Sequence, residues 1–212
     1  MPNWCMNTIT FNGPEEPIKE LKDFISEQRD IPNVAELGHF ATNTWLGTFL
    51  GRAGFNYDDY ECRGQIVDWP DDIVGEKGPG SFTIQTETAW SPMIAMWDAI
   101  AKKFSDEIEI IYTAEEPGMA IYSTNDPAMR SHYNVDKFDE LDEELEEDLQ
   151  GTIFEGELDT HEYSEEEIRA NLLTIYPDRV NDATDQLIDL FQGEYDGITI
   201  NAYEWWPIEE AG

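Results

Sequence analysis

The sequence contains little cysteine and no long apolar run. Its 212 residues include only two cysteines, Cys5 and Cys62, which excludes a disulfide-dense secreted scaffold and predicts free thiols in a reducing compartment. No apolar run approaches the ~18 residues of a membrane-spanning helix, and the opening residues lack the basic and then apolar layout of a signal peptide. We therefore expect a cytoplasmic protein that does not act at a membrane.

Motifs of the common enzyme classes are also missing. The sequence has no glycine-rich phosphate loop, no His-Glu-x-x-His, no Cys-x-x-Cys and no Gly-x-Ser-x-Gly. Its three histidines, His39, His132 and His161, are isolated from one another, and no twelve-residue calcium loop is present. Pairs of carboxylates arise by chance among 47 acids and therefore indicate no acid–base chemistry. We expect no catalytic residues, no metal and no cofactor, and an enzyme of unrecognised type is our third hypothesis.

Negative charge is what the sequence has in excess. It contains 47 Asp and Glu against 12 Lys and Arg, a formal net charge of -35, whereas solubility needs only a few units. The chain should still fold, because 40% of its residues are apolar and 12% are aromatic. DNA, RNA and anionic bilayers would repel such a protein. The expected partner is therefore a basic protein.

The acidity is concentrated toward the C-terminus. Residues 134–212 hold 25 acids and three bases, a net charge of -22, which leaves -13 for residues 1–133. A boundary is expected near residues 125–134, where Asn-Asp-Pro interrupts the strand pattern. We therefore predict two domains, 1–130 and 131–212, with the second an acidic α/β extension packed on the first.

Alternation and helical spacing predict an α+β fold for the first domain. The pattern reads as a strand over residues 5–11, a helix over 14–25 and a strand over 82–90. Ser91 and Pro92 are suited to start a helix, which a hairpin over 108–123 follows. With a short strand at 65–69, the order is strand, helix, strand, strand, helix, strand. This order is typical of a ferredoxin-like sandwich with one added strand.

Residues 31–80 differ from their surroundings, because they hold eight of the 15 glycines and seven aromatic residues. We interpret them as a loop-rich insertion. Glycine-rich mobility combined with Trp, Phe and Tyr is typical of binding hot spots. We expect Trp45 and Phe49 in the core, and Tyr57 and Tyr60 are the candidates for an aromatic contact surface.

An acidic helix is the strongest candidate site. The pattern predicts a helix over residues 136–149, then a strand over 152–158, helices over 165–173 and 180–191, and a strand over 198–203. The first helix would carry six like-charge i,i+4 pairs, which together cost about 1–3 kcal/mol. Its charge density approaches that of duplex DNA. A solvated helix face and a partner-binding surface both remain open. The acids are Asp136, Asp139, Glu140, Asp142, Glu143, Glu144, Glu146, Glu147 and Asp148.

Three stretches carry a family resemblance. The opening Met-Pro-Asn-Trp-Cys-Met-Asn, the run Thr-Ala-Trp-Ser-Pro at 88–92 and the run Tyr-Thr-Ala-Glu-Glu-Pro-Gly at 112–118 occur in this order. Together they resemble the YubB-type ferredoxin-like family of phage and plasmid proteins, over roughly residues 1–125. Relatives usually carry Trp-Gly-Thr-Lys-Trp in the middle, where this chain has Trp-Leu-Gly-Thr-Phe at 45–49. The resemblance implies a mobile-element origin and a bacterial host cytoplasm, but no established activity.

Our leading hypothesis is a phage-encoded acidic inhibitor that mimics DNA. It would occupy the basic groove of a host defence protein of the CRISPR–Cas or restriction type. The alternative is a non-catalytic accessory or assembly protein whose sheet mediates protein contacts, including a homodimer, with acidity serving only solubility. The sequence does not decide between the acidic helix and the aromatic insertion as the contact surface.

Overall fold

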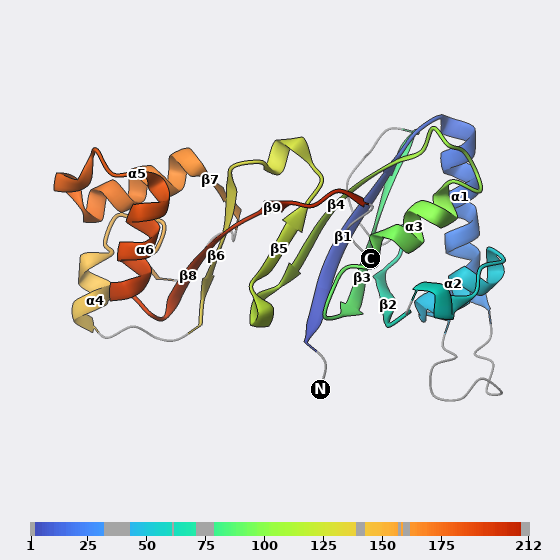
Figure 1. Ribbon diagram of the computed structural model, residues 1–212, viewed down its shortest axis with the longest axis horizontal. Coiled ribbons are helices and arrows are strands. Elements are labelled where there is room, and N and C mark those ends of the chain that lie inside the picture. Colours follow the sequence, from blue (N-terminus) through green and yellow to red (C-terminus); the bar gives the residue numbers. More distant parts are fainter. Residues whose placement is uncertain are drawn as a thin grey trace. The chain divides into compact units, whose positions relative to one another are not determined.

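The computed structural model shows a mixed α+β protein, with six α-helices and two sheets in the part of the chain that it describes (Figure 1). The described residues are 3–31, 43–60, 62–70, 79–138, 143–156, 158 and 162–208. The chain divides into two compact units. Unit 1 contains the described residues up to Pro127 and those from Trp205 on, and unit 2 is Ala128–Glu204.

This division differs from the expected domains at the C-terminal end, which belongs to unit 1 and not to the extension. Strand β9 (Glu204–Trp205) lies next to β5 in the first sheet. The amide of Trp206 donates to the carbonyl of Thr124 (2.9 Å), and the hydroxyl of Tyr112 donates to the carbonyl of Trp206 (2.8 Å). Unit 2 is therefore an insertion between two neighbouring strands of unit 1.

The sheet of unit 1 has six strands in the order β2-β3-β1-β4-β5-β9. The pairs β2–β3, β3–β1, β1–β4 and β4–β5 are all antiparallel. A bulge interrupts β2 between Ile66 and Asp68. The five strands besides β9 are β1 (Trp4–Asn12), β2 (Gly64–Asp68), β3 (Ser81–Ala89), β4 (Glu109–Glu116) and β5 (Ile121–Thr124).

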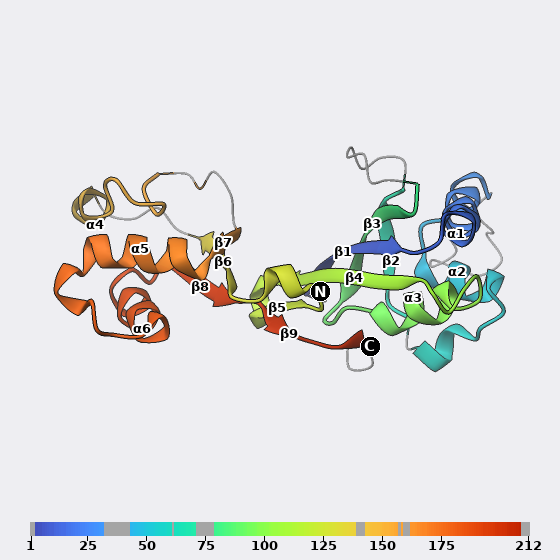
Figure 2. The same cartoon turned by 90° about the horizontal axis from the view of Figure 1, so that it is seen from above.

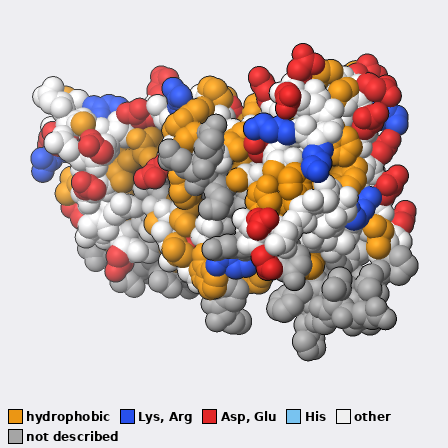
Figure 3. Space-filling model, turned by 45° about the vertical axis from the view of Figure 1, so that its right-hand side comes forward, with side chains coloured by type: hydrophobic (Ala, Val, Ile, Leu, Met, Phe, Trp, Pro, Cys, Tyr) orange, Lys and Arg blue, Asp and Glu red, His pale blue; other side chains and the backbone are white. Residues whose placement is uncertain are grey.

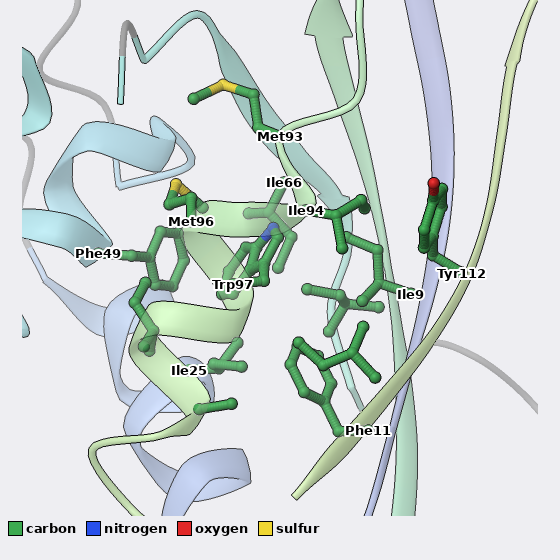
Figure 4. Close-up of a cluster of buried hydrophobic side chains, with 14 of the residues drawn as sticks. Ile9, Phe11, Ile25, Phe49, Ile66, Met93, Ile94, Met96, Trp97 and Tyr112 are labelled. Carbon is green, nitrogen blue, oxygen red and sulfur yellow. The ribbon is translucent and has the colours of Figure 1, made fainter. Parts of the chain in front are cut away.

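Helices α1 (Glu15–Glu27), α2 (Leu46–Arg52) and α3 (Ile94–Ala101) gather on one side of these strands (Figure 2). Alternate residues of β1 are buried because successive side chains of a strand point to opposite faces. Figure 4 shows the resulting core, in which Phe11 and Trp97 meet between strands and helices with ring centroids 6.0 Å apart. Phe49 of α2 lies 5.4 Å from the Trp97 ring.

Two details of unit 1 differ from the prediction. Helix α3 begins at Ile94 after Met93, without a side-chain cap, so Ser91 is not its N-cap. Part of the expected loop-rich insertion is also helical, since α2 buries Leu46, Phe49 and Leu50 completely. Phe49 is in the core as predicted. The segments 32–42 and 71–78 lie outside the described residues.

Unit 2 is a three-stranded antiparallel sheet with its own core. The strands β6 (His132–Lys137), β7 (Glu162–Ser164) and β8 (Ile198–Ala202) lie in the order β7-β6-β8. The helices are α4 (Glu143–Asp148), α5 (Glu165–Ile175) and α6 (Thr184–Glu194). Phe191 is fully buried, with ring centroids 4.5 Å from Phe154 and 4.6 Å from Tyr195.

Two of the elements predicted for unit 2 are wrong. Residues 136 and 137 belong to strand β6, because Asp136 pairs with Thr199 and Lys137 with Ile198. The strand expected over 152–158 does not form within the described residues, where 149–156 make turns. In these turns the Thr152 hydroxyl donates to the carbonyl of Leu149 (2.7 Å). Helix α6 also begins at Thr184, four residues after the predicted start.

Candidate acidic binding surface

The structure separates the nine acids that the sequence placed on one helix. Asp136 lies in β6, whereas Glu143, Glu144, Glu146, Glu147 and Asp148 lie in α4. Asp139, Glu140 and Asp142 are outside the described residues. Within α4 only the pairs Glu143/Glu147 and Glu144/Asp148 keep the i,i+4 spacing on which the predicted repulsion depended. The continuous helix over residues 136–149 that would imitate a phosphate backbone is therefore not present as predicted, because residues 136 and 137 lie in β6.

The single base of this segment, Lys137, forms its contacts within unit 2. Lys137 has a side chain only 16% exposed, and its Nζ pairs with Oε1 of Glu146 at 2.6 Å. The same Nζ donates to the carbonyl of Gly156 at 3.1 Å. Lys137 thereby neutralises one of the nine predicted acids and ties β6 to α4 and to the turn that follows. Glu147 and Asp148 are exposed.

A second group of acids lies at the starts of α5 and α6. Ser164 caps α5 through a capping box, in which its amide donates to Oε2 of Glu167 at 2.9 Å. The hydroxyl of Thr184 donates to Oε1 of Glu165 at 2.9 Å, which places the first turns of the two helices side by side. Negative charge is favourable at both positions because of the helix dipole. This arrangement collects exposed carboxylates of Glu165, Glu166 and Asp185.

Sequence reasoning predicted a helix over residues 165–173 but did not predict that its start lies beside the start of α6. A usable signal was the spacing of Asp185 and Asp189, which lie four residues apart on α6 and are both exposed. Residues i and i+4 are neighbours on a helix surface, so these two carboxylates share one face. The contact between α5 and α6 joins residues that are about 20 positions apart, which no local pattern reveals.

Two further bases of unit 2, Arg169 and Arg179, also bind atoms of their own unit. The Arg169 guanidinium donates to the carbonyls of Asp182 (2.7 Å) and Val180 (3.0 Å). Arg179 pairs with Asp182 at 3.4 Å. Residues 128–204 hold 23 of the 47 acids and four of the 12 bases, so their net charge is -19. The negative charge of unit 2 is therefore only slightly compensated from within.

On the face drawn in Figure 3, the acids among the described residues do not form one continuous row. In the view of Figure 3, acidic side chains are scattered over the face and its rim, with hydrophobic and basic side chains between them. Such a distribution produces a diffuse negative field around the protein and does not reproduce a regular array of charges. Attraction of a basic partner over a distance needs only the field.

The capping box also affects a pKa. The Ser164 hydroxyl and amide both donate to the Glu167 carboxylate, and these bonds hold the pKa of Glu167 below its ordinary value. Hydrogen bonds to the ionised form favour that form. Glu167 thus stays charged at lower pH than an ordinary glutamate.

The aromatic candidates lie in the 3₁₀ turn Tyr57–Tyr60. Tyr60 is half-buried and packs against the core of unit 1, with its ring edge-on to Phe55 at 5.8 Å. The Tyr57 side chain lies outside what the structure describes. Tyr60 is therefore a packing residue at least in part, which weakens the case for an aromatic contact surface in this turn.

Neither cysteine has the environment of a reactive thiolate. Burial is the main cause that raises the pKa of Cys5 to about 12, and Glu116 adds to it. Burial likewise raises the pKa of Cys62 to about 12. The neighbouring cation, Arg63, has its guanidinium over the Trp90 ring, 4.9 Å from the centroid. Both thiols are protonated at neutral pH.

The described residues contain no group of three or more His, Cys, Asp or Glu arranged to hold a metal ion. Among the same residues, no helix combines the length and the apolar character needed to cross a membrane. In comparisons with known proteins, no family model, curated protein or solved structure matches the chain.

Proposed function

We propose that this protein is an acidic inhibitor that occupies the nucleic-acid-binding groove of a basic protein. The observation that carries the proposal is the charge of unit 2, which has a net charge of -19 while its bases at 137, 169 and 179 bind atoms of the same unit. Excess charge of one sign destabilises a folded unit through self-repulsion. An opposing partner would offset that repulsion.

The mechanism is competition. Carboxylates at the starts of α5 and α6 would form ion pairs and charge-assisted hydrogen bonds with the Arg and Lys that otherwise hold phosphates. Opposite fields would speed the association. The scattered placement of the acids favours electrostatic and steric blocking over imitation of a regular phosphate backbone.

For the origin and the finer fold, we propose a phage-encoded protein whose unit 1 is ferredoxin-like. The strand order β2-β3-β1-β4 with antiparallel pairs supports this, because it is the order that two interlocked βαβ halves produce. The likeness of residues 1–125 to YubB-type proteins supports a mobile-element origin. The partner would then be a host defence protein of the CRISPR–Cas or restriction type.

The test is a competition experiment. The protein is used to capture partners from bacterial lysate at low and at high salt, and each captured protein is purified and loaded with labelled duplex DNA or RNA. We expect this protein to displace the nucleic acid, and the displacement to weaken steeply as salt rises. A captured partner that binds nucleic acid and this protein simultaneously, without loss of affinity for either, would rule out the proposal.

A matched pair of variants assigns the effect to unit 2. The test variant combines Glu166→Gln, Asp185→Asn and Asp189→Asn. The control combines Glu15→Gln, Glu16→Gln and Glu20→Gln on α1, which are also exposed and remove the same charge. Displacement should weaken clearly more in the test variant. Equal loss in both variants would mean that only total charge matters.

The alternative is an assembly protein whose sheet mediates protein contacts and whose acidity serves only solubility. One observation favours it: large hydrophobic side chains such as Trp4 and Met6 are exposed on unit 1. Sedimentation over a range of salt concentrations tests it directly. A stable homo-oligomer at physiological salt would support this alternative.

A further inference from the structure

The face of the first sheet that points away from the helices carries an unusual row of side chains. Met6 lies directly opposite Glu87 on β3 and opposite Glu115 on β4. Trp4 is the next residue of β1 on the same face, because Cys5 between them is buried toward the helices. Trp4 is 45% exposed and Met6 is 43% exposed. The exposed thioether of Met6 is thus flanked on both sides by carboxylates, and the exposed indole of Trp4 is its neighbour along β1.

Single exposed hydrophobic residues are normal on protein surfaces, and each of these alone would need no explanation. Here two of them adjoin on one strand, and the register adds a carboxylate on each neighbouring strand. Strands lie about 4.8 Å apart, so the two carboxylates stand on strands roughly 10 Å apart with Met6 between them. The side chain of Gln65 on β2 donates to Oε1 of Glu87 at 2.5 Å, which orients that carboxylate.

The backbone beside this row is strained. Trp90 has φ of 67°, and the amide of Ser91 donates to the carbonyl of Ala89 at 2.9 Å, which makes a γ-turn with Trp90 at its centre. The turn is held to β1, since the Trp90 amide donates to the carbonyl of Asn3 at 2.9 Å. A bulky residue with positive φ persists only where its surroundings enforce it, and such strain gathers at functional sites.

Trp90 also shows which chemistry suits this end of the sheet. The guanidinium of Arg63 lies over its ring at 4.9 Å from the centroid. A cation over an indole face is attracted by the quadrupole of the ring, and guanidinium groups are the commonest partners. Trp4 presents a second, partly exposed indole, two residues along β1 from Met6, which lies between Glu87 and Glu115.

We propose that the row Trp4, Met6, Glu87 and Glu115 binds an arginine-rich segment of a basic protein. One guanidinium stacks on the Trp4 indole, and neighbouring cationic side chains pair with Glu87 and Glu115 while their aliphatic stems cover Met6. A second copy of this chain is a poor occupant, because each copy carries a net charge of -35. The proposal shares with the proposed function a basic partner, and it adds a contact surface on unit 1.

The probe is a synthetic tetra-arginine peptide, with tetra-lysine for comparison, titrated calorimetrically into the full-length protein at 150 mM salt. We expect tetra-arginine to bind more tightly, because a planar guanidinium stacks on aromatic faces better than an ammonium. Trp4→Ala, which leaves the charge unchanged, should weaken tetra-arginine binding about fivefold, and Trp4→Phe should weaken it less. Circular dichroism checks that each variant is folded.

Two double variants that remove the same charge distinguish binding at the row from attraction by the overall negative charge of the protein. Glu87→Gln with Glu115→Gln should weaken binding of tetra-arginine at least threefold more than Glu16→Gln with Glu20→Gln, which removes the same charge from α1. The proposal is overturned if Trp4→Ala binds as tightly as the parent protein, or if both double variants lose affinity equally. The nucleic-acid displacement test does not depend on this result, so the two proposals can fail separately.

Discussion

Unit 1 has the larger hydrophobic core, whereas unit 2 carries the larger net negative charge. Among the described residues, the main buried apolar cluster of unit 1 has 23 members and that of unit 2 has 12. Residues 128–204 nevertheless carry a net charge of -19, whereas the rest of the chain, with 24 acids and eight bases, carries -16. The unit with the smaller core therefore has the larger self-repulsion. We infer that unit 2 is the less stable of the two and the more sensitive to salt.

The comparison also concerns how the units are connected. Unit 2 begins after β5 and ends at Glu204, the first residue of β9, and the chain continues into unit 1 from Trp205. Unit 1 already has its central strands and three helices before the chain enters unit 2. Unit 1 should therefore keep its structure when unit 2 unfolds, apart from the short return strand.

The largest expected effect tests this independence. Phe191→Ala removes a ring packed between Phe154 and Tyr195 and should cost unit 2 about 3–5 kcal/mol, which is enough to unfold a small unit. Trp97→Ala should destabilise unit 1 by a similar amount. Hydrogen exchange on each variant checks which residues lose protection.

The expected result is that Phe191→Ala exposes the amides of residues 128–204 to exchange while the amides of β1 and β3 stay protected. This result would support independent unfolding of the two units. A loss of protection throughout both units would contradict it and would mean that the chain folds as one cooperative body. The parent protein at low and high salt is the control, since added salt should protect unit 2 more than unit 1.

A smaller effect is expected at the start of α5. Ser164→Ala removes the cap and should destabilise unit 2 by about 1 kcal/mol, because an amide at the helix start loses its acceptor. Helix α1 of unit 1 begins after Pro14 without a side-chain cap and offers no such target. Thermal unfolding of the two proteins measures the difference.

The same variant has a pH signature. In the parent protein the Glu167 pKa is lowered, so its stabilising contribution is present above the ordinary glutamate pKa and is lost as pH falls through the lowered value. In Ser164→Ala the Glu167 pKa should return toward its ordinary value. An NMR titration of the Glu167 carboxyl carbon checks this, and an unchanged pKa would mean that the cap does not hold the carboxylate.

A slightly smaller effect should follow from Lys137→Gln. This change breaks the pair with Glu146, in which Lys137 is 16% exposed, and should cost about 0.5–1 kcal/mol, more at low salt. Lys19→Gln on α1 is the control, because its pair with Asp23 is exposed on both sides and should contribute close to nothing. Equal losses in chemical denaturation would show that the two pairs do not differ.

The smallest effect concerns thiol chemistry and reports on unit 1 alone, since both cysteines lie there. Burial raises the pKa of Cys5 and of Cys62 to about 12, so alkylation by iodoacetamide at pH 7.5 should be slow in the folded protein and fast after denaturation. In Phe191→Ala the slow rate should persist. Rapid alkylation of Cys5 in that variant would show that unit 1 opens together with unit 2.

Local patterns predicted the elements whose periodicity is regular. Strand β1 and helix α1 were expected within a few residues of their observed bounds, as were β3 and the β4–β5 hairpin. Their alternating or helical spacing of apolar residues is enforced by the face that each element buries. Helix α2 was missed because its seven residues are too few to show a period and contain two glycines.

The sequence by itself determined the charge excess, the order of the main elements of unit 1 and the residues of its core, because each depends on composition or on spacing within one element. The tertiary structure decided what depends on distant partners. Residue 136 satisfies a helical pattern, yet it lies in a strand because Val135–Lys137 pair with β8, more than 60 residues away. The return of β9 to unit 1 also depends on pairing between distant strands. The same is true of the placement of Met6 between Glu87 and Glu115. Register across a sheet joins residues that no local pattern connects.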